Sequence, residues 1–132
     1  MTDRNKAIAY VIPANMEAPI REVILVGEAM SGTDELTFLP AMYPLIDTQI
    51  VEHVDCVILP GTCLWVDENG TMRDSRVNIR ASILAGFPIV GDVMLCGDDG
   101  ERTASLTVPA TFFNTLHFLA MEVIATMKGN PQ

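Results

Sequence analysis

The chain has 132 residues, a length that suits one domain, so residues 1–132 are predicted to form a single domain. Hydrophobic residues make up 49% of the chain and charged residues only 19%, a balance that excludes intrinsic disorder. Eight Lys and Arg against seventeen Asp and Glu give a formal net charge of −9. This charge would repel a phosphate backbone, so we expect no direct binding to nucleic acid.

The composition and the ends of the chain predict a cytoplasmic protein with no membrane contact. The first six residues are polar and do not resemble a secretory signal. Residues 103–121 carry no charge, but they include Pro109, Asn114 and His117, which favour a core helix over a membrane span. The three cysteines have no CxxC spacing, which is typical of inert thiols in a reducing compartment.

Two strands are predicted near the N-terminus. Residues 6–12 place apolar side chains on one parity and end at Pro13. Residues 21–26 form a second apolar run that ends at Gly27. The short loop between them favours a hairpin.

An irregular helix is predicted next. Thr33 is a candidate N-cap, and two acidic residues follow it in the first turn, where the helix dipole favours negative charge. Pro40 and Pro44 each remove a backbone donor, so we expect the helix to break at Pro40. The apolar runs 49–54 and 56–59 are candidate short strands.

A hairpin is predicted at Asn69-Gly70, because both residues tolerate the positive φ of a type I′ turn. Its strands would be residues 62–66 and a return strand that begins at Thr71. The polar run 73–76 is expected to leave the sheet as a loop.

The last third of the chain predicts a strand, a turn and a long helix. Residues 87–96 are strongly apolar, and residues 103–106 are expected to pair back onto them. A helix should begin at Pro109 and close at Lys128. Its apolar face is so wide that we expect the sheet or another subunit to cover it.

These elements predict an α+β fold, in which a small, mostly antiparallel and hairpin-rich sheet carries one irregular helix and one C-terminal amphipathic helix. The apolar excess of the chain also predicts a homo-oligomer, a dimer or larger. A symmetric dimer through the C-terminal helix is the arrangement we expect.

Few residues in the chain suggest catalysis or a metal. The glycine spacing after Gly27 lacks the lysine of a phosphate loop. His53, Cys56 and Cys63 form only a loose trio, and buried structural cysteines explain them better than zinc, so neither a metal nor a cofactor is expected. His117 is expected to be a half-buried helix residue. No hydrolase signature is present, so we expect no catalytic residues, although an unrecognised dyad with a histidine stays open.

A run of polar residues is the strongest candidate for a binding site. Arg73, Arg76 and Arg80 are three of the eight cations, and arginine forks suit carboxylate or phosphate. The run could therefore receive a small anionic ligand or an acidic partner surface. The alternative is that these arginines pair with the excess Asp and Glu of the chain itself.

Three segments carry a family resemblance. Residues 64–74 (LWVDENGTMRD), 77–82 (VNIRAS) and 89–97 (IVGDVMLCG) resemble domain-of-unknown-function family 3846. The resemblance implies a small accessory protein of phages, prophages and related bacterial genomes. Asn78, Arg80 and Asp92 match the family pattern, although Asp92 could equally serve a turn. The candidate ligand-binding residues are Arg73, Arg76, Asn78, Arg80, Trp65 and Asp92.

The expected function is that of a non-enzymatic, phage-type accessory protein. It would bind or sequester a host protein or a small anionic, nucleotide-like ligand in the host cytoplasm and so blunt a host defence. Two alternatives stay open: a small enzyme that acts on a nucleotide-type substrate, and a structural or assembly protein of a virion.

Overall fold

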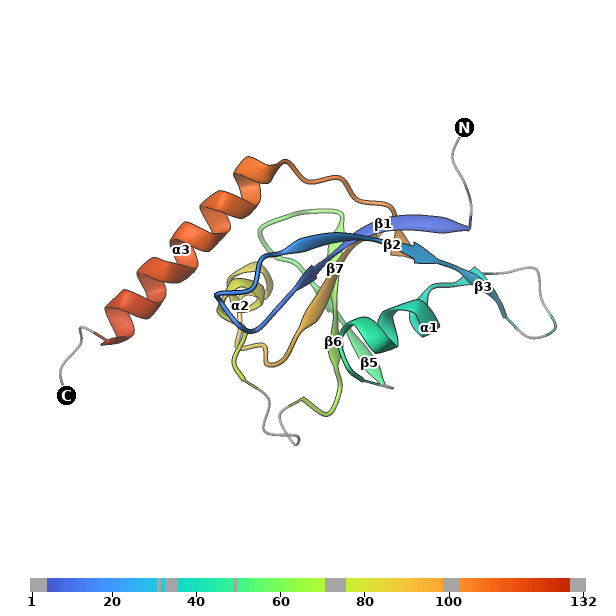
Figure 1. Ribbon diagram of the computed structural model, residues 1–132, viewed down its shortest axis with the longest axis horizontal. Helices are drawn as coiled ribbons and strands as arrows, with labels where there is room; N and C mark the ends of the chain where they lie inside the picture. Colours follow the sequence, from blue (N-terminus) through green and yellow to red (C-terminus); the bar gives the residue numbers. More distant parts are fainter. Residues whose placement is uncertain are drawn as a thin grey trace.

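A computed structural model describes residues 5–30, 32, 36–48, 50–70, 76–98 and 103–128 (Figure 1). Four strands precede the first helix, a short 3-10 turn (η1) follows that helix, and each later helix follows a pair of strands. In chain order they are β1 (Lys6–Ile12), β2 (Arg21–Val26), β3 (Glu28–Ala29), β4 (Leu36–Thr37), α1 (Leu39–Met42), η1 (Tyr43–Leu45), β5 (Val51–Asp55), β6 (Thr62–Asp67), α2 (Ile79–Ala85), β7 (Val93–Asp98), β8 (Thr103–Ala104) and α3 (Ala110–Lys128).

The main sheet has the strand order β2-β1-β7-β6-β5, with β8 paired to β7, and every pairing is antiparallel. The prediction of an α+β fold with a mostly antiparallel sheet is therefore confirmed. Strands β1 and β2 have the predicted bounds, and β8 pairs back onto β7 as predicted. At the centre of the sheet, Tyr10 of β1 lies opposite Leu95 of β7.

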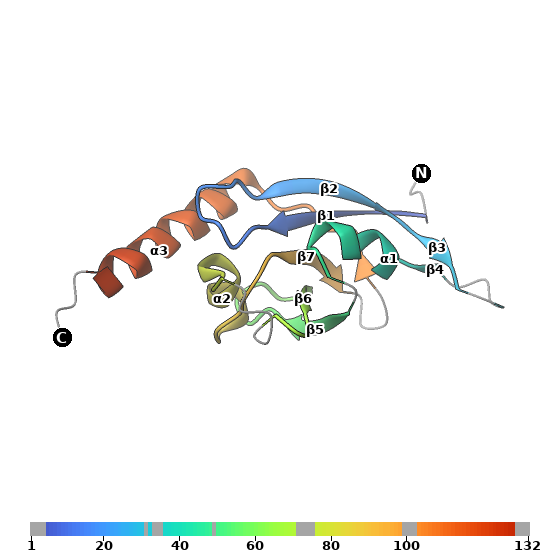
Figure 2. The same ribbon diagram turned by 60° about the horizontal axis from the view of Figure 1, so that its bottom comes forward.

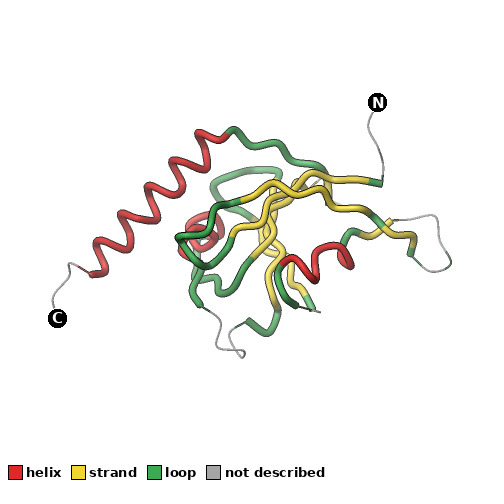
Figure 3. Tube along the Cα trace, in the orientation of Figure 1, coloured by secondary structure: helices red, strands yellow, loops and turns green. Residues whose placement is uncertain are grey.

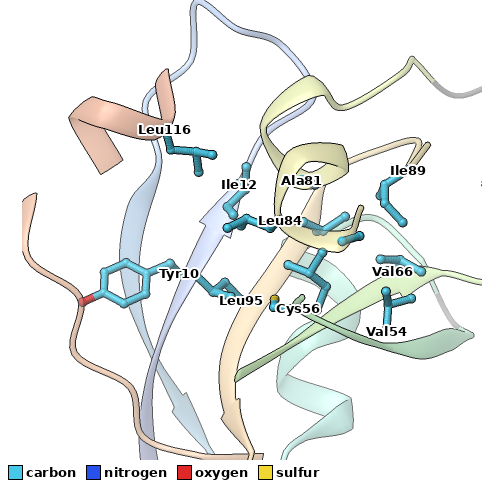
Figure 4. Packing of buried hydrophobic residues seen from close by; sticks show 13 residues of the cluster. Tyr10, Ile12, Val54, Cys56, Val66, Ala81, Leu84, Ile89, Leu95 and Leu116 are labelled. Atoms are coloured by element: carbon cyan, nitrogen blue, oxygen red, sulfur yellow. The ribbon is translucent and has the colours of Figure 1, made fainter. Parts of the chain in front are cut away.

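Each face of the sheet carries its own core, because side chains along a strand alternate between the two faces. Ile12 of β1 and Leu95 of β7 face α2, in a cluster that Leu116 of α3 also joins (Figure 4). Val11 of β1 and Met94 of β7 face the opposite way, toward α1. The sheet is therefore a middle layer, with α1 on one side and α2 and α3 on the other (Figure 2).

The helix α2 was not predicted. Asn78 is its N-cap, and the Asn78 side chain accepts a hydrogen bond from the Ala81 backbone N–H. Gly86 ends the helix with φ of 84°, a conformation that glycine adopts without strain. Both signals stand in the sequence, but the helix has only seven residues, too few for a periodic pattern to stand out.

The predicted hairpin at Asn69-Gly70 is wrong. Strand β6 already has two neighbours, β5 on one edge and β7 on the other, and a strand has only two hydrogen-bonding edges. The chain instead turns between β5 and β6 around Gly61, whose φ is 78°. The predicted start of the return strand, Thr71, lies outside the described residues.

The irregular helix begins later than predicted. The proposed cap Thr33 lies outside the described residues, and the next described residues, Leu36–Thr37, form β4 with β3. Helix α1 starts at Leu39, so Pro40 stands in its first turn rather than at a break. The first turn tolerates proline because its backbone N–H groups have no partner within the helix. Pro44 then opens η1 in the same way.

The helix α3 is less covered than predicted. The Val108 N–H donates to the Tyr10 hydroxyl at 3.0 Å just before it begins, and Leu116 and Ala120 are its buried residues. Its second half extends past the sheet, as the tube in Figure 3 shows. By length and composition α3 could also cross a membrane, although core helices pass the same test.

Candidate functional site

The candidate site is a cavity of about 770 Å³ between the β1–β2 loop and α3. Met16 and Ile20 line it from the loop, and Phe113 and Met121 line it from the helix. Arg80 of α2 also lines the cavity, because α2 packs against both the sheet and α3. The cavity thus joins segments that are far apart in the sequence.

Arg80 holds the loop wall of the cavity in place. One terminal nitrogen of its guanidinium, Nη2, donates to three backbone carbonyls, those of Pro13 at 2.8 Å, Ala18 at 3.0 Å and Asn15 at 3.2 Å. A guanidinium with several fixed donors is suited to such a cluster of acceptors. The β1–β2 loop is therefore tied to α2 and forms a fixed wall.

The charge of Arg80 is unusual because the residue is only 2% exposed. Within the described part of the chain, no carboxylate lies within ion-pair distance of it. Its Nε–H is buried and makes no hydrogen bond there. Burial lowers the pKa of Arg80, because the cation has lost water, yet an arginine stays charged at neutral pH. The buried cation is compensated by carbonyl dipoles alone.

The rim of the cavity adds polar groups to an apolar lining. Asn114, His117 and Lys128 reach it from α3, and Glu17 reaches it from the loop. With Arg80 and Lys128 against Glu17, this region carries a net positive charge in a chain whose total is −9. An amphipathic anion, with an apolar body and an acidic group, fits such a lining.

Arg76 and Asp92 come together elsewhere, at a smaller cavity of about 300 Å³. Asp47 and Asp67 share its lining, so acidic groups outnumber the single arginine there. One carboxylate oxygen of Asp92 accepts a hydrogen bond from the Ala14 N–H at 2.9 Å, which ties Asp92 to a segment far away in the sequence. This cavity is less suited to an anion than the larger one.

The other predicted site residues are placed apart from one another. Asn78 is fully buried, and its amide donates to the carbonyls of Ile12 and Gly91, both at 2.9 Å. Trp65 lies on the α1 face of the sheet, away from the larger cavity. Arg73 lies outside the described residues. Of the six candidates, Arg80 is the one that lines the larger cavity.

The cysteines are not activated as nucleophiles. Burial raises the pKa of Cys56 and Cys96, and it raises the pKa of Cys63 to about 12. Because a thiolate is the reactive form, a raised pKa disfavours these thiols as nucleophiles at neutral pH. The described cysteines therefore offer no support for nucleophilic catalysis.

Sequence reasoning missed the contribution of α3 to the site. His117 is exposed and lines the cavity, whereas it was expected to be half-buried. The α3 residues that line the cavity include five at a helical spacing of three or four: Phe113, His117, Met121, Ile124 and Lys128. That stripe is visible in the sequence, but nothing local shows that it faces a loop rather than solvent.

The fold and the cavity define a small α+β protein with a partly apolar recess that the buried Arg80 also lines. The chain belongs to the family described as Domain of unknown function (DUF3846), whose model matches residues 12–117. The family resemblance read from the sequence is thereby confirmed.

Among solved structures, the chain is similar in fold to part of the crystal structure of the small RNA methyltransferase HEN1, with a TM-score of 0.59 at 17% sequence identity. The match covers 82% of this chain but only 16% of that protein. At this identity the likeness concerns the fold of one part alone. No curated protein sequence matches the chain significantly.

Proposed function

We propose that this protein works by binding a small organic anion in the cavity between the β1–β2 loop and α3, without transforming it. The observation that carries the proposal is Arg80, a buried cation beneath the cavity with no described carboxylate partner. Carbonyl dipoles alone compensate this cation, and taking a charge out of water costs several kcal/mol. A bound anion would offset part of that cost.

The chemistry of the lining restricts the ligand. An acidic group, carboxylate or phosphate, would sit toward Arg80, and the apolar body would lie along Met121 and Ile124. His117 and Lys128 would contact a second polar part of the ligand at the rim. A nucleotide-like molecule combines these features, so nucleotides are the first class to test.

We also propose that a second copy of the chain is a partner of α3. Leu116, Ala120, Val123 and Met127 follow one stripe of the helix, and α2 and the sheet cover only its first half. Val123 is 39% and Met127 66% exposed. The stripe has no charged residue, so the acidic chains would not repel each other there.

The biological role that fits these properties is the one the family resemblance implies. A phage-type accessory protein could sequester a host signalling molecule of this chemical class and so blunt a defence system. Its partner would then be the small anion. A host protein is the alternative partner, and it would be favoured if no small anion binds.

Calorimetric titration of the full chain with nucleoside mono-, di- and triphosphates and inorganic phosphate tests the proposal. We expect at least one nucleotide to bind, and we expect His117→Gln and Lys128→Gln each to weaken it about tenfold, the loss of one hydrogen bond to a charged group. Both residues are exposed on α3, so the variants should fold. Lys6→Gln removes one positive charge outside the cavity and is the matched control.

Three outcomes would contradict the proposal. If no member of the panel binds, or if Lys6→Gln weakens binding as much as Lys128→Gln does, the cavity is not the site. If the bound nucleotide is released chemically altered after the protein is denatured, the chain is an enzyme rather than a binding protein.

A further inference from the structure

Three potential metal ligands from three neighbouring strands gather on the face of the sheet that carries α1. They are His53 of β5, Cys63 of β6 and Asp98 of β7, and their ligand atoms all lie within 4.8 Å of one another. The closest pair is His53 Nε2 and Asp98 Oδ2, at 3.1 Å. None of the three takes part in the anion cavity.

The register of the sheet explains why they meet. Cys63 lies opposite Asp55 of β5 and opposite Cys96 of β7. The side chains of Asp55, Cys63 and Cys96 therefore share one face of the sheet. His53 stands two residues before Asp55 on β5, and Asp98 stands two residues after Cys96 on β7. A two-residue step along a strand returns to the same face. The donors therefore project from paired strands rather than from loops, which fixes their positions.

We propose that His53, Cys63 and Asp98 together bind one zinc ion, with solvent in the fourth position. Tetrahedral zinc with bonds of about 2.0–2.3 Å places neighbouring donor atoms about 3.3–3.6 Å apart. The His53–Asp98 separation of 3.1 Å already lies near this value. The remaining donor distances, at most 4.8 Å, need a side-chain adjustment of about 1 Å.

The donor set selects the class of metal. One imidazole, one thiolate and one carboxylate suit zinc, whereas magnesium and calcium prefer oxygen ligands alone. Coordination replaces the S–H bond of Cys63 with a sulfur–zinc bond, and the proton leaves to the solvent. The net reaction is metal ion plus thiol giving metal thiolate plus one proton.

The surroundings of the cluster are consistent with a metal site. Cys63 is 1% exposed, but the side chains of His53 and Asp98 are 39% and 25% exposed, so an ion can enter from their side. An Asp55 carboxylate oxygen lies 3.7 Å from His53 Nδ1, where it can orient the ring once Nε2 holds the metal. The ring of Trp65 packs on His53, with centroids 5.2 Å apart.

The experiment uses the full chain without a histidine tag, freed of metal by a chelator. Separate metal-free samples are titrated with Zn²⁺ and with Co²⁺, because Co²⁺ binds more weakly and would not displace Zn²⁺. We expect one Zn²⁺ per chain by equilibrium dialysis. Co²⁺ should produce a thiolate-to-cobalt charge-transfer band in the near ultraviolet, and it should quench the emission of Trp65, the one tryptophan of the chain. The absorption band reports Cys63 directly.

Substitutions at the three ligands should weaken Zn²⁺ binding at least about 100-fold. This loss exceeds the one expected when a ligand keeps the metal but loses a hydrogen bond that orients it. His53→Gln and Asp98→Asn change partly exposed side chains and should fold, whereas Cys63→Ser tests the buried thiol. His117→Gln is the matched control, because His117 is the other histidine of the chain and lies on α3. It should leave metal binding unchanged.

The proposal is overturned if Zn²⁺ does not bind stoichiometrically, if Co²⁺ gives no thiolate band, or if Cys63→Ser binds Zn²⁺ as the unmodified chain does. The anion proposal is separate, because His117→Gln should weaken nucleotide binding and spare zinc, and His53→Gln should do the reverse.

Discussion

Asn78 shows how much one buried polar side chain can do in this fold. Its carbonyl oxygen caps α2 by accepting from Ala81 N, and its amide nitrogen donates to the carbonyls of Ile12 and Gly91. A helix, a strand and a turn therefore meet at one residue. This structural role accounts for the Asn78 side chain without any ligand.

Replacing Asn78 with alanine should lower the free energy of unfolding by about 3 kcal/mol, because a cap is lost and two buried carbonyls lose their donors. Asn78→Asp keeps the cap acceptor but not the two donors, so it should also destabilise. Urea denaturation of the unmodified chain and the variants measures this. Asn114→Ala, at an exposed position of α3, is the control. A loss below about 1 kcal/mol for Asn78→Ala would show that the three hydrogen bonds do not matter.

Among the elements, β8 is the shortest strand of the main sheet, yet it determines the path that the chain takes from the sheet to α3. It pairs with the end of β7, and the Leu106 N–H that follows it donates to the Ile8 carbonyl at 2.9 Å. The Ser105 hydroxyl accepts a hydrogen bond from the Ile8 N–H at 3.0 Å. This crossing brings the chain over β1 toward the start of α3.

The crossing requires glycine at position 97. A Cβ there would lie 2.8 Å from the Ser105 carbonyl oxygen and 2.9 Å from that of Ala104, both backbone atoms that cannot rotate away. Gly97→Ala should therefore lower the free energy of unfolding by about 1–3 kcal/mol. Gly61→Ala is the comparison that isolates backbone strain. Gly61 has φ of 78°, and a Cβ there would meet no atom within 4 Å, so the variant adds strain without steric overlap. Its cost should be about 1 kcal/mol. Thermal or urea unfolding in which Gly97→Ala costs less than Gly61→Ala would contradict the crossing as described.

At the scale of the whole molecule, the half-covered stripe of α3 is the apolar surface that gains most from being covered. Leu116 and Ala120 pack against the body, but Val123 and Met127 continue the stripe in the open. A second copy of the chain would cover them by the same apolar contact.

The unmodified chain should therefore be a dimer by light scattering at tens of micromolar. Val123→Asn with Met127→Asn should shift it to a monomer, because the apolar contact is lost while the domain stays folded. Phe118→Asn, on another face of the same helix, should not. A monomeric unmodified chain would overturn the dimer, and flotation of the chain with lipid vesicles would assign α3 to a membrane instead.

Local patterns in the sequence determined a good part of this structure. The period-two alternation and the bounding Pro13 and Gly27 located β1 and β2. The apolar composition excluded disorder, and the succession of predicted elements indicated an α+β fold. Helix α3 ends at Lys128 within the described residues, as its closing cation predicts. These features depend on the sterics of a few consecutive residues, so they can be read along the chain.

The tertiary structure alone decided which segments meet. Asn69-Gly70 carries a strong hairpin signal, but the edge it needed on β6 is occupied by β7, a strand from much later in the chain. In the same way, Arg80 reaches the cavity and His53 reaches Asp98 only because the register brings distant residues together. Such contacts depend on how all the strands compete for edges and apolar cover at once, a balance that no local window of the sequence contains.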